Sequence, residues 1–270
     1  MRPRWIALLS ASIAVLVGVM TWVAIGAGVG IGNSVLGTPR DSTEASAEFA
    51  ATDVYAVTED GTLDPQPDRR AGVVWDQLLR VTTPEFAASM ITRFQTGDDP
   101  DSDTLAYVAS ADDPTTWVVA ANLAYADDPD LLLATLVHEY AHMLSLGPDD
   151  VDAAATECDT EWAGAGCLIP DADLERFAQR FWSGYTDAPA RDNVDADVAW
   201  DFYQAHEEDF VSDYAATNAS EDFAETFATY VVEPETDAAD SVIAEKFAFF
   251  AALPEYAAAR ERIRAEFGLN

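Results

Sequence analysis

The pattern of apolar and polar positions divides the chain into a short N-terminal stretch without charge and a long body. Residues 5–36 contain no charged side chain, and the apolar core at 5–31 exceeds the roughly 20 residues that cross a bilayer. Two arginines precede this stretch and acidic residues follow it, which favours a cytoplasmic N-terminus and an exported body. Residues 1–36 are therefore predicted to be a transmembrane signal anchor. Small residues at 24–28 leave open a cleaved signal peptide, and a buried core helix is the third interpretation.

Residues 37–67 are predicted to be a linker and irregular segment, because Ser, Thr, Gly and acidic residues are followed by the turn-forming residues at 64–67. Residues 68–270 are predicted to form one domain. Apolar residues at helical spacing predict helices, and alternating apolar and polar residues predict strands. The helices are expected at 70–80, 84–95, 131–146, 171–182, 221–232, 241–253 and 255–267, and the strands at 104–109 and 117–126. This order predicts an α+β fold, mainly helical, with a small sheet beside the helix at 131–146.

Charge narrows the range of partners. The chain has 49 acidic and 14 basic residues, a formal net charge of −35. Such a surface repels nucleic acid and anionic lipid, so neither is an expected partner. The acidic surface is compatible with steering of basic peptides, but a solvated, soluble surface is the favoured interpretation.

Candidate chemistry is concentrated in the helix at 131–146, which carries His138, Glu139 and His142. Residues four apart lie on the same helical face, so the two imidazoles can hold one metal ion. A glutamate beside them can take a proton from water, which is the H-E-x-x-H arrangement of zinc hydrolases. The alternative is a buried helix with hydrogen-bonded histidines. The metal interpretation is favoured because two of the three histidines in the chain occupy the motif, and the third, His206, is given no role.

A catalytic zinc takes three protein ligands, so one more must come from elsewhere. No histidine follows His142 closely, which excludes the extended H-E-x-x-H-x-x-G-x-x-H pattern. The best downstream source is residues 213–230, where Glu221 and Glu225 lie one helical turn apart. One carboxylate can complete a His-His-Glu site while the other orients an imidazole. Alternatively, both acids only favour the helix dipole.

The two segments together resemble the gluzincin metallopeptidases, most closely the anthrax lethal factor-type catalytic domain and related bacterial zinc peptidases. The resemblance covers residues 117–146 and 213–232, and it implies a zincin-like fold. It also implies that Glu221 is the third zinc ligand and that Tyr214 lies near the metal and assists the transition state. Glu225 is the expected outer carboxylate, and it departs from the aspartate that thermolysin-type members have at this position.

The two cysteines, Cys158 and Cys167, lie close in sequence in a body that is expected to be exported. A local disulfide is the expected pairing. Zinc ligation is the alternative, but two cysteines without further partners make a poor structural site.

The expected function is a membrane-tethered or secreted zinc endopeptidase that acts on protein or peptide, with Glu139 as general base and Tyr214 stabilising the oxyanion. The strand at 117–126 is expected either to pair with an extended substrate or to lie inside the sheet. Two alternatives are an inactive zincin-like domain that serves as an extracytoplasmic binding module, and a cell-envelope interaction domain without metal.

Overall fold

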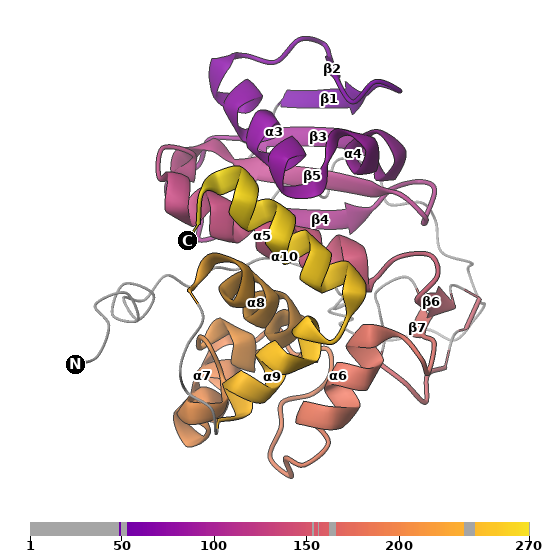
Figure 1. Ribbon diagram of the computed structural model, residues 1–270, viewed down its shortest axis with the longest axis vertical. Helices are drawn as coiled ribbons and strands as arrows, with labels where there is room; N and C mark the ends of the chain where they lie inside the picture. The colour runs from indigo at the N-terminus through magenta and orange to yellow at the C-terminus, as the bar shows by residue number, and fades with distance from the viewer. Residues whose placement is uncertain are drawn as a thin grey trace, which may run out of the picture.

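The computed structural model describes residues 49, 53–152, 154–155, 157–161, 166–234 and 241–269 (Figure 1). The predicted membrane segment at 1–36 lies outside these residues. Within them, no helix has the length and apolar character that crossing a bilayer requires.

A five-stranded sheet with the order β2-β1-β3-β5-β4 forms one layer. Its strands are β1 (Asp53–Val57), β2 (Leu63–Asp64), β3 (Ile91–Gly97), β4 (Ala106–Ser110) and β5 (Trp117–Asn122). β3 and β5 run parallel, and the other pairs are antiparallel. β5 is buried along its whole length, and β4 has a neighbour on one side only among the described strands.

Helices pack below and in front of the sheet in Figure 1, and α5 lies between the sheet and the helices of the C-terminal half. They are α3 (Arg69–Thr82), α4 (Pro84–Met90), α5 (Pro129–Ser145), α6 (Asp173–Phe181), α7 (Ala196–Ala205), α8 (Ala219–Val232), α9 (Val242–Ala251) and α10 (Pro254–Phe267). α8 packs on α5, and α10 crosses both α3 and α8. The α+β prediction is confirmed, with about half of the described chain in helices.

Two local signals fix the helices that matter most for the site. α5 begins at an Asp128 cap, whose carboxylate accepts hydrogen bonds from the backbone N–H groups of Asp130 and Leu131. α8 begins at an Asn218 cap, whose side chain accepts from the N–H groups of Ser220 and Glu221. Each cap therefore sets the rotation at which the helix enters the core.

Three element predictions are wrong. The helix expected at 84–95 ends at Met90, because the residues from Ile91 onward pair with β1 and β5 as β3. The segment 37–67, expected to be linker and irregular, contributes β1 and β2 to the sheet. The strand expected at 117–126 stops at Asn122, whose side chain caps a 3₁₀ turn at Leu123–Tyr125. In the first two cases β1 and β3 are rich in β-branched and aromatic residues, so pairing in the sheet agrees with their local propensity.

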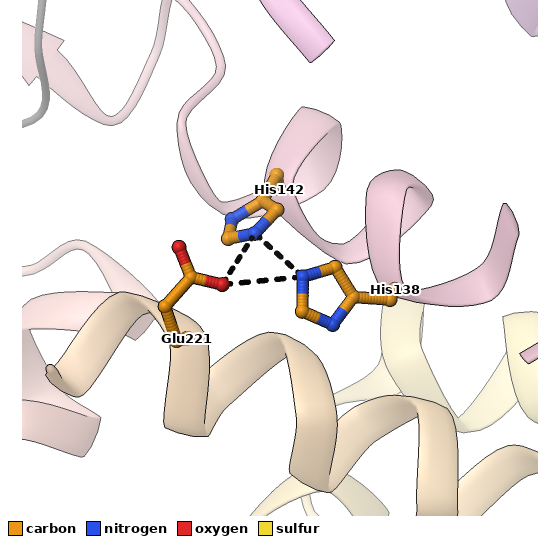
Figure 2. A group of neighbouring side chains, drawn as sticks. All are labelled: His138, His142 and Glu221. Carbon is orange, nitrogen blue, oxygen red and sulfur yellow. Dashed lines mark hydrogen bonds and ion pairs between the residues drawn. The ribbon is translucent and has the colours of Figure 1, made fainter. Parts of the chain in front are cut away.

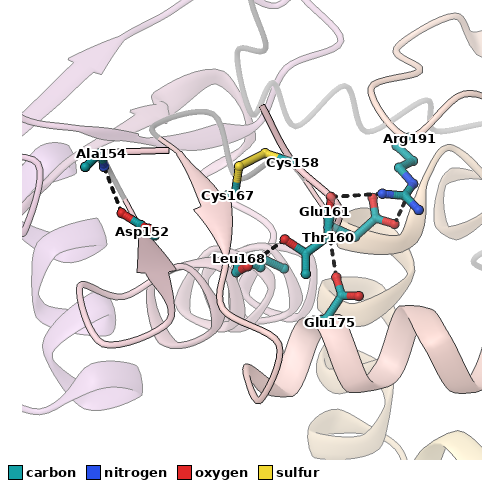
Figure 3. Close-up of a disulfide and its surroundings, with 9 residues drawn as sticks. All are labelled: Asp152, Ala154, Cys158, Thr160, Glu161, Cys167, Leu168, Glu175 and Arg191. Carbon is teal, nitrogen blue, oxygen red and sulfur yellow. Dashed lines mark hydrogen bonds and ion pairs between the residues drawn. A yellow bond between two sulfur atoms is a disulfide. The ribbon is translucent and has the colours of Figure 1, made fainter. Parts of the chain in front are cut away.

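The disulfide prediction is confirmed: Cys158 and Cys167 are bonded (Figure 3), so neither is a zinc ligand. Cys167 opens β7 (Cys167–Leu168), which pairs with β6 (Val151–Asp152). Beside the bond, Arg191 donates to the carbonyl of Thr160 (2.9 Å) and pairs with Glu161 (3.1 Å). The disulfide thus fixes a loop that is held in turn to the segment leading into α7.

Replacing both cysteines with alanine is expected to lower stability by about 2–3 kcal/mol in the chain-entropy model, since the bond closes a loop of about ten residues. For a body of this size the melting temperature should fall by roughly 5–10 °C. Thermal unfolding with and without reductant measures this, and the double alanine variant should not respond to reductant. A melting temperature unchanged in both experiments would show that the loop contributes nothing to the cooperative fold.

Candidate metal centre

The helix α5 brings His138 and His142 onto one buried face, with Glu139 between them in sequence. Their exposed fractions are 2%, 0% and 0% respectively, so all three polar groups lie inside the core. Polar groups buried to this extent require partners. Most of the other residues of α5 are apolar, which keeps the helix packed between the sheet and α8.

Glu221 reaches the two histidines from the first turn of α8 (Figure 2). Its Oε2 atom lies 3.2 Å from His138 Nε2 and 3.4 Å from His142 Nε2, and the two Nε2 atoms are 3.0 Å apart. The predicted convergence of these residues is confirmed. Among the described residues it is the one group of three or more acidic, histidine or cysteine side chains found close enough to hold a metal ion.

The protonation of the histidines fits a cation at this point. The Nδ1 atom of His138 lies 2.8 Å from Glu225 Oε1, and carboxylate oxygens only accept, so Nδ1 carries the proton. When the His138 imidazole is neutral, its Nε2 atom carries no proton, and the lone pair of this atom points toward Glu221. His142 Nδ1 lies 3.4 Å from the hydroxyl of Ser220, which leaves its own Nε2 facing the same point.

The three converging atoms face one another, and the geometry of Glu221 Oε2 does not satisfy a hydrogen bond to either ring despite the short distances. A tetrahedral zinc with bonds of about 2.0–2.1 Å spaces its ligand atoms about 3.3–3.4 Å apart. The observed 3.0, 3.2 and 3.4 Å lie close to that spacing. The His138, His142 and Glu221 set therefore fits a divalent metal ion.

Without metal, the electrostatics keep a proton in the cluster. Burial alone would lower the pKa of His138, but the neighbouring carboxylates of Glu221 and Glu225 outweigh it and raise the pKa to about 10. Burial alone would raise the pKa of Glu221, yet His142 and His138 lower it to about 2. Burial lowers the pKa of His142. One proton on His138 therefore occupies the place that a metal ion would take.

Glu139 is the other notable carboxyl. Burial raises its pKa to about 8, against the opposing charge of His138. The backbone N–H of Val108, in β4, is near enough to lower this pKa slightly, but neither carboxyl oxygen makes a full hydrogen bond. The group lies next to the paired imidazoles with both oxygens unused, as a proton acceptor requires.

Tyr214 lies on the 3₁₀ turn Tyr214–Ala216, just before α8, with its ring centre 6.0 Å from that of His138. Burial, followed by the charges of Glu221 and Glu139, raises the pKa of its hydroxyl well above the ordinary value. The hydroxyl is therefore protonated at neutral pH and can donate a hydrogen bond.

A buried ion pair lies immediately behind the third ligand. Asp222, the neighbour of Glu221, accepts from Lys246 at 2.7 Å, and the side chains are 0% and 1% exposed. Lys246 Nζ also donates to the backbone carbonyl of Asp209 at 2.7 Å. The pair ties α9 to the start of α8. Because breaking one side of a buried pair leaves an uncompensated charge, this contact fixes where α8 begins.

The residues at the outer edge of the site were only partly foreseen. Glu225 was expected as an outer carboxylate and does contact His138. Ser220 faces His142, and Ser212 donates to Glu225; sequence reasoning missed both of these contacts. No periodicity marks Ser212, because it lies in an irregular segment.

The strand β5 does not offer an edge to a substrate. β3 pairs with one side of it and β4 with the other, so the interior-strand interpretation is confirmed and pairing of a substrate with β5 is wrong. The edge strands among the described residues are β2 and β4, and β4 is the one that packs against α5.

The zinc-free protein is expected to lose stability as the pH rises from about 6 to 9. Folded His138 has a pKa of about 10 against 6.5 ordinarily, so its contribution is complete below 6.5 and is lost as the pH rises toward 10. The pKa of Glu139 is about 8 in the folded protein against 4.5 ordinarily. Because the unfolded carboxyl ionises more easily, Glu139 also lowers the stability as the pH rises between these two values. Thermal unfolding in chelator at several pH values measures the decline.

In the presence of zinc this decline should shrink or reverse, because a bound cation replaces the proton and binds better as protons leave. A variant with Glu221→Gln and Glu225→Gln, which removes the carboxylates that raise the pKa of His138, serves as the control and should show a flatter profile. A zinc-free melting temperature that rises over this range would contradict the assigned protonation.

Comparison of the chain with protein-family models, with curated proteins and with solved structures finds no match.

Proposed function

We propose that this protein is a zinc-dependent endopeptidase with a zincin-like fold. The observation that carries the proposal is the convergence of two imidazole nitrogens from α5 and one carboxylate oxygen from α8 within 4.8 Å of one another. Three protein ligands are the usual number for a catalytic zinc, which keeps a further position for water. Glu139, in the same helix, provides a carboxyl without another partner.

The roles of the residues follow from their chemistry. His138, His142 and Glu221 would hold zinc, which supplies Lewis acidity, polarises a carbonyl and lowers the pKa of water to about 7. Glu139 accepts the proton of the attacking water and delivers it to the leaving amine. The protonated Tyr214 hydroxyl donates to the oxyanion that develops on the peptide carbonyl, a contribution of about 3–4 kcal/mol for a donor of this kind.

An extended peptide is the substrate that best suits the surroundings. β4 has no strand neighbour on its outer side among the described strands, and it lies against the helix that carries the histidines. Strand addition is a common way to bind peptides. The acidic composition favours substrates that are not themselves acidic, and it disfavours nucleic acid.

The proposed location is outside the cytoplasm, with residues 1–36 as a membrane anchor or as a signal segment that is removed on secretion. The Cys158–Cys167 bond supports this location, because disulfides persist in oxidising compartments. The remaining support is the length and charge pattern of the N-terminal segment.

A zinc titration of the full chain, combined with mass spectrometry of an unbiased peptide mixture, tests the proposal. About one zinc per chain and cleavage that requires zinc are expected. Failure to bind zinc would refute the metal centre. Stoichiometric zinc without any cleavage would instead favour an inactive zincin-like domain that binds a partner.

A further inference from the structure

A chain of hydrogen bonds leads away from His138 through two further residues. His138 Nδ1 donates to Glu225 Oε1 at 2.8 Å, and the second oxygen of the same carboxylate, Oε2, accepts from the hydroxyl of Ser212 at 2.6 Å. The hydroxyl oxygen of Ser212 in turn accepts from the backbone N–H of Ala215 at 3.0 Å. Two hydrogen bonds therefore converge on the Glu225 carboxylate, one from the imidazole and one from a hydroxyl whose oxygen is itself held by a backbone N–H.

The direction of the hydrogen bond between Ser212 and Glu225 must be fixed, because the hydroxyl group of a serine can rotate. A serine has one proton to donate, and its oxygen accepts from others. The N–H of Ala215 occupies the oxygen of Ser212, so the hydroxyl proton is directed at Glu225. Ala215 belongs to the 3₁₀ turn that also carries Tyr214, and Asp213 caps this turn by accepting from the Tyr214 N–H at 3.1 Å. The hydroxyl is thus fixed by a rigid piece of backbone.

Glu225 needs such a restraint more than the zinc ligands do. Its side chain is 20% exposed, whereas those of His138 and Glu221 are 2% and 4% exposed. A partly exposed carboxylate can turn toward water and abandon the imidazole, and glutamate loses considerable rotamer freedom when it is held. The bond from Ser212 offsets this cost and keeps the second oxygen facing His138.

We propose that Ser212 is a positioning residue for the metal centre: its hydroxyl holds Glu225 against His138, and so orients the imidazole and keeps its proton on Nδ1. This inference rests on the proposed zinc site, but it does not require that the protein cleave peptides. Outer partners of this kind typically change metal affinity by 10–100-fold.

The test is a set of zinc affinities for the full chain, measured by competition with a chromophoric chelator. Ser212→Ala should weaken zinc binding about 10-fold. Ser212→Thr, which keeps the hydroxyl, should restore most of the affinity. Ser89→Ala is the matched control: it removes an exposed hydroxyl that donates to the carbonyl of Phe86, and it should leave affinity unchanged.

A double-mutant cycle with Glu225→Ala identifies the route of the effect. If Ser212 acts through Glu225, Ser212→Ala should cost less than about 2-fold once Glu225 is gone. An equal loss in both backgrounds, or no loss in the wild-type background, overturns the inference. The melting temperature of each zinc-free variant checks the fold, and Ser212→Cys, which keeps the size of the side chain, replaces Ser212→Ala if that variant unfolds.

The outcomes separate this inference from the proposed function. A wild-type chain that binds no zinc overturns both. A chain that binds zinc and cleaves no peptide removes the peptidase proposal, while the affinity series still decides the role of Ser212.

Discussion

Replacing Glu139 with glutamine is expected to leave zinc binding within about 3-fold of wild type and to slow peptide cleavage by roughly 10²–10⁴-fold, the range that general acid–base catalysis contributes. The side chain is fully buried beside the imidazoles and has no hydrogen-bond partner to lose. Its pKa of about 8 means that the zinc-free protein holds it largely neutral at pH 7. Glutamine is a neutral group of the same shape, so the fold should tolerate it.

Three measurements are needed for this variant: zinc content, melting temperature and rate of cleavage. Glu208→Gln makes the same change at an exposed carboxyl in the C-terminal half and should leave all three unchanged. If Glu139→Gln cleaves peptides at the wild-type rate with zinc bound, another group accepts the proton. If it loses zinc, Glu139 supports the metal directly and the assigned division of roles is wrong.

Glu221→Ala is expected to remove zinc binding, with affinity weakened by more than the 10–100-fold typical of outer partners. The variant leaves two imidazoles, and two ligands are too few for a stable catalytic zinc. It also exchanges a buried carboxylate for a gap beside His138 and His142, which lie 3.2 and 3.4 Å from its Oε2 atom.

A comparison with Glu225→Ala tests whether Glu221, and not Glu225, is the third metal ligand. Glu225 lies one turn further along α8 and, of the three residues of the metal centre, hydrogen-bonds only to the outer nitrogen of His138, so its removal should weaken zinc binding less than that of Glu221. Glu208→Ala again serves as the exposed control. Full zinc occupancy in Glu221→Ala, or a larger loss in Glu225→Ala, would overturn the assignment of the third ligand.

The parts of the site that share a helix were predictable from the sequence. The spacing of His138 and His142 forces their side chains onto one face, and the Asp128 cap with Pro129 marks where that helix begins. The nomination of Glu221 needed more than spacing, because acids in the first turn of a helix are common without a metal. Spacing alone could not choose between Glu221 and Glu225. The family resemblance favoured Glu221, and the structure places Glu221 beside the histidines.

The parts that failed depend on partners distant in sequence. Ile91–Gly97 follows α4 without a break, and its β-branched and aromatic residues become β3 by pairing with β1 and β5. Ser212 is similar: one serine among many becomes important only because α8 brings Glu225 within reach of it. Hydrogen bonds between segments that are not adjacent in the chain are not marked by any periodic pattern in the sequence.

Lys246, paired with Asp222 behind the third ligand, is the single lysine of the chain. With its ammonium group sealed in the core, the folded body presents no side-chain amine to solvent, and amine-specific reagents should acylate this position only when α8 and α9 separate. The rate at which the fragment that contains Lys246 gains mass would therefore report how often the helices around the site open. Comparing the rate with and without zinc would show how far metal binding closes this part of the molecule.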